Sequence, residues 1–136
     1  MADLKISQLT AVTSLDGTEP IPVVQSSTTK KATVAQLLTG QVVTESGTSR
    51  TLSATDNGKI IYCTSASAVT INCAAGLGVG FNTTIIQGGT GKVTVAANGQ
   101  TLNSYSGLLS TMGQYAVISV VAPIANTFIA AGNLGV

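Results

Sequence analysis

Residues 59–73, with the sequence KIIYCTSASAVTINC, decide the fold class of this chain. Apolar and polar side chains alternate on both sides of a short Ser/Ala run, which is the pattern of two strands that each bury one face. We expect the two strands to form a hairpin with the two cysteines at its far ends. The residues predicted to point inward are Ile61, Cys63, Val69, Ile71 and Cys73.

The same alternation continues toward the C-terminus. Strands are predicted near 59–63, 69–73, 81–87, 92–96, 100–103, 115–121 and 126–131, with Gly- and Asn-rich turns between them. Val93, Val95, Val117 and Ile129 are the further residues predicted to point inward. No internal repeat is apparent. The sequence therefore predicts an all-β fold, with an antiparallel β-sandwich or jelly-roll-like module over residues 58–136.

Composition agrees with an all-β fold. Hydrophobic residues make up 44% of the 136 residues, yet aromatic residues are only 4%, so most of the apolar side chains are aliphatic. Val, Ile and Thr favour strands, and fifteen glycines supply turns. The length allows one compact domain, preceded by a short arm.

Residues 1–40 form that arm, and residues 41–57 read as a polar connector. The arm has a predicted strand over 21–25 and a second strand that runs into a helical turn. Thr33 is the expected N-cap of the turn, and Gln36 stands three residues later in the capping-box position. So small a unit cannot bury a core by itself, which suits an attachment element.

Charge is scarce and unevenly placed. Charged residues are 8% of the chain, against roughly 25% in an average domain, and residues 93–136 carry none. This absence favours an interface between copies of the chain; the alternative is a surface of uncharged polar side chains. We expect Ile118, Val120 and Ile129 at a subunit interface. The alternate residues Val117, Ser119 and Val121 are expected in the subunit's own core.

The side chains needed for catalysis or metal binding are missing or scattered. The chain has no histidine, and its acids all precede residue 58. Asp16 and Glu19 stand in an apparent turn, and GGTGK at 88–92 lacks the spacing of a phosphate-binding loop, so we interpret it as a hairpin turn. Two cysteines without histidine make no zinc site. We therefore predict no enzyme activity, no metal and no cofactor.

Nucleic-acid and membrane partners are also not expected. Six basic residues and a net charge of +1 give no basic cluster. Residues 117–136 are uncharged, but Pro123, Asn126 and Asn133 interrupt them, so they fit a turn between two strands better than a membrane span. No signal-peptide pattern opens the chain, and we expect a protein made in the cytoplasm.

The opening LKISQLTAVTSLDGTEPIPVVQSSTTKKATVAQLL resembles the N-terminal segment of tailed-bacteriophage fibre, spike and related virion proteins. Four groups of residues carry this resemblance. The second half of the chain resembles β-modules of phage fibres and of capsid-bound fibre or decoration proteins, in the stretches GFNTTIIQGGTGKVTVAANGQTL, GQYAVISVVAP and NTFIAAGNL. The four groups are Lys5-Ile6-Ser7, Gly17-Thr18-Glu19, Pro22-Val23-Val24-Gln25 and Thr29-Lys30-Lys31-Ala32-Thr33.

This resemblance implies a structural protein of the virion that works as a homotrimer. Its partners would be copies of itself and the major capsid protein or another virion structural protein. The implied role is a head fibre or capsid decoration protein; the alternative is a tail-fibre or baseplate adaptor in host attachment. The resemblance places virion docking in the first unit, at Pro22, Val23, Val24, Gln25, Lys30 and Lys31.

Overall fold

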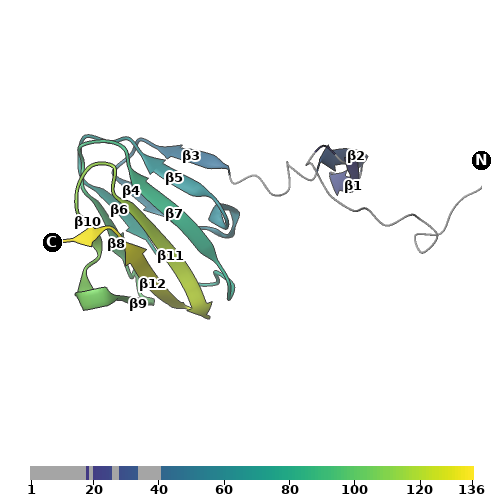
Figure 1. Ribbon diagram of the computed structural model, residues 1–136. Helices are drawn as coiled ribbons and strands as arrows, with labels where there is room; N and C mark the ends of the chain where they lie inside the picture. Colours follow the sequence, from purple (N-terminus) through teal and green to yellow (C-terminus); the bar gives the residue numbers. More distant parts are fainter. Residues whose placement is uncertain (1–17, 19, 26–27, 34–40) are drawn as a thin grey trace, which may run out of the picture. The chain divides into compact units, whose positions relative to one another are not determined.

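The structure is a computed structural model that describes residues 18, 20–25, 28–33 and 41–136. The chain divides into two compact units, Met1–Thr39 and Gly40–Val136. In the first unit, strands β1 (Pro20–Gln25) and β2 (Thr28–Thr33) pair antiparallel, with Gln25 opposite Thr28 (Figure 1). The predicted strand over 21–25 is confirmed, whereas the predicted helical turn after Thr33 lies outside the described residues.

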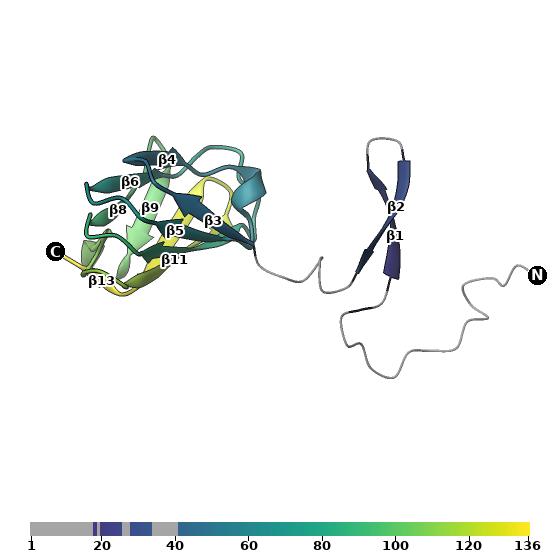
Figure 2. The same cartoon turned by 90° about the horizontal axis from the view of Figure 1, so that it is seen from above.

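The second unit consists of two β-sheets, which appear as two layers in Figure 2. The six-stranded sheet has the order β3-β5-β7-β11-β12-β9, and the five-stranded sheet has the order β13-β10-β8-β6-β4. The strands are β3 (Val42–Glu45), β4 (Ser49–Thr51), β5 (Ile60–Cys63), β6 (Val69–Asn72), β7 (Asn82–Gln87), β8 (Val93–Ala96), β9 (Thr101–Ser104), β10 (Ser110–Thr111), β11 (Val117–Ile124), β12 (Thr127–Gly132) and β13 (Leu134–Gly135). Two short 3-10 turns, η2 (Ala54–Asp56) and η3 (Tyr105–Gly107), lie between strands. The all-β prediction is confirmed.

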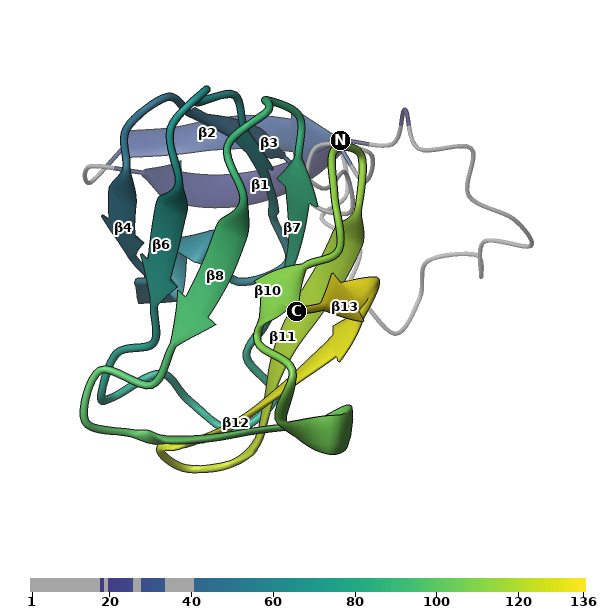
Figure 3. The same ribbon diagram turned by 90° about the vertical axis from the view of Figure 1, so that its left-hand side faces the viewer.

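Strands β3 to β8 wind between the two sheets like a short solenoid. Successive strands enter alternate sheets, and the neighbours β3, β5 and β7 are parallel, as are β4, β6 and β8 (Figure 3). Each pair of strands, β3–β4, β5–β6 and β7–β8, is therefore one coil. The predicted antiparallel sandwich is wrong for these six strands, and β5 and β6, which carry Cys63 and Cys73, do not form a hairpin.

The glycine-rich segment 88–91 turns the corner between two sheets. Gly89 N–H donates to Cys63 O at 2.9 Å, and Gly91 N–H donates to Ser65 O at 3.1 Å. A Cβ on Gly91 would lie 1.9 Å from the carbonyl oxygen of Ser67. The corner after β7 therefore stacks on the corner after β5, and only glycine allows this close approach. The prediction of a hairpin turn here is wrong.

The strands after the third coil complete both sheets. Strand β11 pairs antiparallel with β7 and with β12, and Asn126, with φ 58°, lies in the turn that joins β11 to β12. The prediction of a turn between two strands within 117–136 is confirmed. Strand β9 is parallel to β12 at the edge of the sheet, and β10 is antiparallel to β8. Within the described residues, no helix is long and apolar enough to cross a membrane.

Residues 41–57 are not a connector. Strands β3 and β4 are the first coil of the second unit, and their backbones pair with β5 and β6. The polar composition of this stretch misled the prediction, because β3 and β4 lie at the sheet edges, where much of each strand is exposed.

The core lies between the two sheets. The predictions for Ile61, Cys63, Val69, Ile71, Cys73, Val93 and Val95 are confirmed, since each is at most 1% exposed. Val117 and Ile129 are each 39% exposed, whereas Ile118, Val120 and Phe128 are fully buried. The predicted parity of β11 is therefore wrong.

Candidate interaction surface

The side of the six-stranded sheet that points away from the core carries a continuous set of uncharged side chains, which we call the outer face. Burial alternates along each strand and shows which residues point outward. These residues are Val42, Thr44, Ile60, Tyr62, Asn82, Thr84, Ile86, Thr101, Asn103, Val117, Ser119, Val121, Thr127, Ile129 and Ala131.

The register of the strands arranges the apolar members of the outer face into rows. Tyr62, Ile86 and Val117 are aligned across β5, β7 and β11. Val121 lies directly opposite Ile129 on β12. Val117 and Ile129 are each 39% exposed, and Val121 is 36% exposed. These side chains are therefore partly open to solvent.

The opposite surface, on the five-stranded sheet, has a different chemistry. Its outward residues are Ser49, Thr51, Thr70, Asn72, Thr94, Ala96 and Ser110. Their polar groups bond to one another: Thr94 Oγ1 lies 2.8 Å from Ser110 Oγ, and Asn72 Nδ2 donates to Ser49 Oγ at 3.2 Å. Hydroxyl and amide groups therefore cover this sheet, whereas the outer face carries seven aliphatic side chains beside its Thr, Ser, Asn and Tyr residues. The alternative explanation of the missing charge, a surface of uncharged polar side chains, therefore applies to the five-stranded sheet.

The charged side chains of the first coil, Glu45, Arg50 and Asp56, lie where the core ends, beside the edge strands β3 and β4. Arg50 on β4 is in register with the buried Ile71, so it occupies an inward position. Its Nη2 contacts Asp56 Oδ1 at 2.6 Å, and its Nη1 contacts Glu45 Oε2 at 3.2 Å. An inward-pointing ion pair at an edge coil caps the core and opposes edge-to-edge stacking of sheets.

Asp56 is the buried member of this cluster, with 1% of its side chain exposed. Burial opposes ionisation of Asp56, but hydrogen bonds from Arg50 and from Ser53 outweigh it, so the pKa of this carboxyl lies below its ordinary value. Asp56 is thus an ionised structural residue.

The remaining reactive and polar side chains of the second unit also have structural roles. Cys63 and Cys73 are buried, as predicted, and both are free; burial raises the pKa of each thiol to about 11. Thr111 Oγ1 donates to Gln87 Oε1 inside the core and accepts the N–H of Val93 at 3.0 Å. The described part of the chain contains no group of three His, Cys, Asp or Glu residues placed to hold a metal ion.

One shallow hollow on the second unit is lined by Ala54, Asn57, Gly78, Val79 and Phe81. Asn57 is its amide-bearing residue, and its Oδ1 already accepts the N–H of Asn82 at 2.9 Å. The hollow offers no reactive group, and the outer face is the larger candidate site.

The predicted interface residues separate in the structure. Ile118 and Val120 are fully buried in the core of their own chain, so the prediction that they contact a neighbouring subunit is wrong. Strand β11 is apolar on both parities, and alternation within a single strand does not say which parity the chain buries by itself. Ile129 lies on the outer face and stays a predicted interface residue. Val121, predicted in the core, lies directly opposite Ile129, and Val117, also predicted in the core, lies farther along β11 on the same face.

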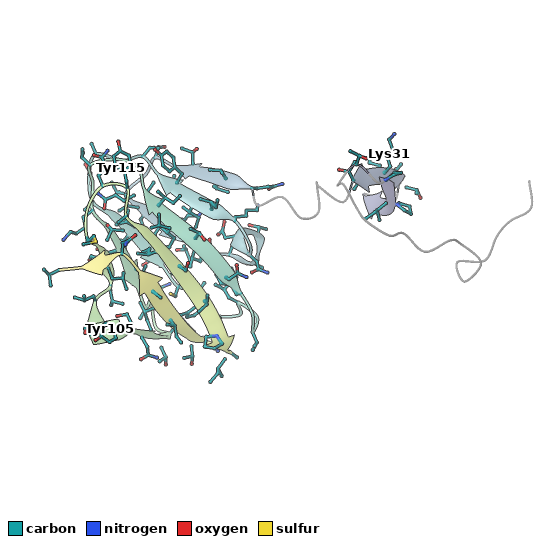
Figure 4. All side chains as sticks on the ribbon, in the orientation of Figure 1. Lys31, Tyr105 and Tyr115 are labelled. Atoms are coloured by element: carbon teal, nitrogen blue, oxygen red, sulfur yellow. The ribbon has the colours of Figure 1, made fainter. Side chains whose placement is uncertain are left out.

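The predicted docking residues lie together on the β1–β2 hairpin of the first unit. Pro22 is opposite Lys31, Val23 is opposite Lys30, and Gln25 is opposite Thr28. Pro22 and Lys31 are exposed (Figure 4). Pro20 and Pro22 stand two residues apart on β1, and proline cannot donate a backbone hydrogen bond, so prolines are confined to the edges of sheets.

Neither the protein-family models nor the curated proteins give a match for this chain.

Proposed function

We propose that this chain is a non-enzymatic structural component of a tailed-bacteriophage virion, and that it acts as a trimeric head fibre or capsid decoration protein. The observation that carries the proposal is the outer face, an uncharged surface on which seven of the fifteen outward side chains are aliphatic, on a chain whose described residues offer no catalytic group. A partner that covers such a surface removes its apolar side chains from water and so stabilises the assembly. The phage assignment comes from the resemblance of residues 4–38 to virion-docking segments.

The division into two units supports a separate docking function for the first one. Strands β1 and β2 form a two-stranded sheet, and a two-stranded sheet alone is only marginally stable in water. Such a hairpin gains stability when it packs on a partner. The exposed Lys31 and the backbone of β2 give it an attachment surface for a virion protein.

Binding to virus particles tests the proposal. The full chain should bind particles that lack it, and residues 41–136, which contain a complete core, should not. Co-sedimentation followed by quantitative mass spectrometry gives the copy number per particle. Hundreds of copies support capsid decoration, whereas a few tens support the tail-fibre or baseplate alternative. Failure of the full chain to bind any particle would contradict a virion role.

A further inference from the structure

We infer that copies of this chain meet through the outer face of the six-stranded sheet, with Val121 and Ile129 near the centre of the contact. This inference deepens the proposed function, since it names the surface that an oligomeric virion protein would use. The paired residues Val121 and Ile129 are 36% and 39% exposed on neighbouring strands. Ser119 and Ala131 form the adjacent pair on the same strands.

The charge pattern selects a second copy as the occupant. The fifteen outward residues of this face include no charged side chain. A partner with charges at the contact would have to desolvate them without a counter-charge, which costs several kcal/mol for each buried ion. An identical outer face has no such charge, and three copies that turn this face toward a common threefold axis would bring only uncharged side chains together.

The other surfaces of the second unit are less suited to self-association. The outward side chains of the five-stranded sheet are polar except for Ala96, and two pairs of them bond to one another, among them Thr94 and Ser110. The open end of the first coil carries the ion pair between Arg50 and Asp56. Burying either surface would desolvate polar groups and remove little aliphatic area from water, whereas the outer face offers seven aliphatic side chains beside its eight polar ones.

The size of the outer face fits a specific contact. Strands in a sheet lie about 4.8 Å apart and rise about 3.3 Å per residue. Six strands of four to eight residues therefore cover about 500 Å² before the relief of the side chains is counted. A standard interface buries about 800 Å² on each partner, so this face supplies most of one partner's share.

Charged substitutions on the two sheets form a matched test in the full chain. Multi-angle light scattering at micromolar concentration should give three times the 13.6 kDa of one chain for the wild type. Val121→Lys and Ile129→Lys should give folded monomers by circular dichroism, whereas Thr94→Lys, on the other sheet, should leave the trimer intact. A monomeric wild type overturns the inference. So does a Thr94→Lys variant that dissociates while Val121→Lys does not.

A cysteine variant keeps the test decisive if a lysine variant fails to fold. Ser119→Cys changes one atom at the middle of the outer face, and the native Cys63 and Cys73 are buried and do not compete for reagent. A short bis-maleimide should crosslink Ser119→Cys between chains but should not crosslink Thr94→Cys. The reverse pattern overturns the inference. Loss of particle binding with intact crosslinking would count against the virion role alone.

Discussion

Tyr115 is the residue whose backbone conformation fits its side chain least well. Its φ is 68°, in the left-handed region that a bulky side chain rarely adopts, and its side chain is 70% exposed (Figure 4). Its N–H donates to Gln87 O at 2.7 Å, which holds it in the turn before β11. The conformation is therefore imposed by the sheet and not by packing of the ring.

Replacing Tyr115 with glycine should stabilise the second unit. Left-handed backbone costs an ordinary residue about 1–2 kcal/mol, and the exposed ring has little packing to lose. We expect Tyr115→Gly to raise the free energy of unfolding by about 1 kcal/mol in urea titrations. Gln114→Gly, one residue earlier at negative φ, should lower it. A less stable Tyr115→Gly variant would mean that the ring packs on the protein.

Asp56 should stabilise the fold only while it is ionised. Removing one partner of a buried ion pair costs about 3–5 kcal/mol, so Asp56→Asn should lose about that much at pH 7. The pKa of Asp56 is lower in the folded chain than in the unfolded chain. The stabilisation is thus present above the unfolded-state pKa and is lost as the pH falls toward the folded-state pKa.

The measurement is urea denaturation of the wild type and Asp56→Asn at pH 7 and at pH 3. The difference between the two proteins should become smaller at pH 3. Glu45→Gln is the control, because Glu45 contacts Arg50 at the longer distance of 3.2 Å and should lose less. A difference that does not change with pH would show that Asp56 acts through its shape alone.

The two thiols should be inert in the folded chain. Burial raises the pKa of both Cys63 and Cys73 to about 11, so about one thiol in a thousand is ionised at pH 8. Thiolate is the reactive species, and neither sulfur is accessible. Ellman's reagent at pH 8 should therefore release colour only after guanidinium is added. Rapid release from the native protein would show that a core strand opens easily.

At the scale of elements, glycine at the corners holds the coils together. Gly91 lies in the corner after β7, where a Cβ would meet the carbonyl oxygen of Ser67 at 1.9 Å. Gly91→Ala must push two corners apart and break the hydrogen bond from Gly91 N–H to Ser65 O. We expect a loss of about 2–4 kcal/mol in the free energy of unfolding, measured by urea titration.

Gly78 supplies the matched control for this corner. A Cβ on Gly78 has no atom within 4 Å, and its φ is not positive. Gly78→Ala should therefore be neutral or slightly stabilising. Equal losses at Gly78 and Gly91 would contradict the view that the two corners are in close contact.

Local patterns located the strands but not their partners. The predicted strands at 59–63, 69–73 and 81–87 nearly coincide with β5, β6 and β7, because alternation is a property of each strand alone. Whether two strands pair as a hairpin or as neighbouring coils depends on contacts distant in sequence. The coils also differ in length: Val42, Ile60 and Thr84 are in register at intervals of 18 and 24 residues, which hides the repeat.

At the scale of the whole chain, the absence of charge predicts an interface but does not say on which surface it would form. Uncharged residues cover both sheets, and only the register shows that the exposed Val and Ile side chains gather on the outer face. The parity of β11 was ambiguous for the same reason, since Val117 and Val121 are as apolar as Ile118 and Val120. Alternation along β11 therefore could not show which of its two faces the chain buries by itself.

The last prediction concerns the independence of the two units. The core of the second unit extends from Leu52 to Phe128 and draws on both sheets of that unit. Residues 41–136 should therefore fold alone, with the urea midpoint of the full chain and the same oligomeric state, because the outer face is also complete within them. Circular dichroism and light scattering of the two proteins measure this. A truncated protein that folds but becomes monomeric would place part of the subunit contact in residues 1–40, and the outer face would then not be sufficient for assembly.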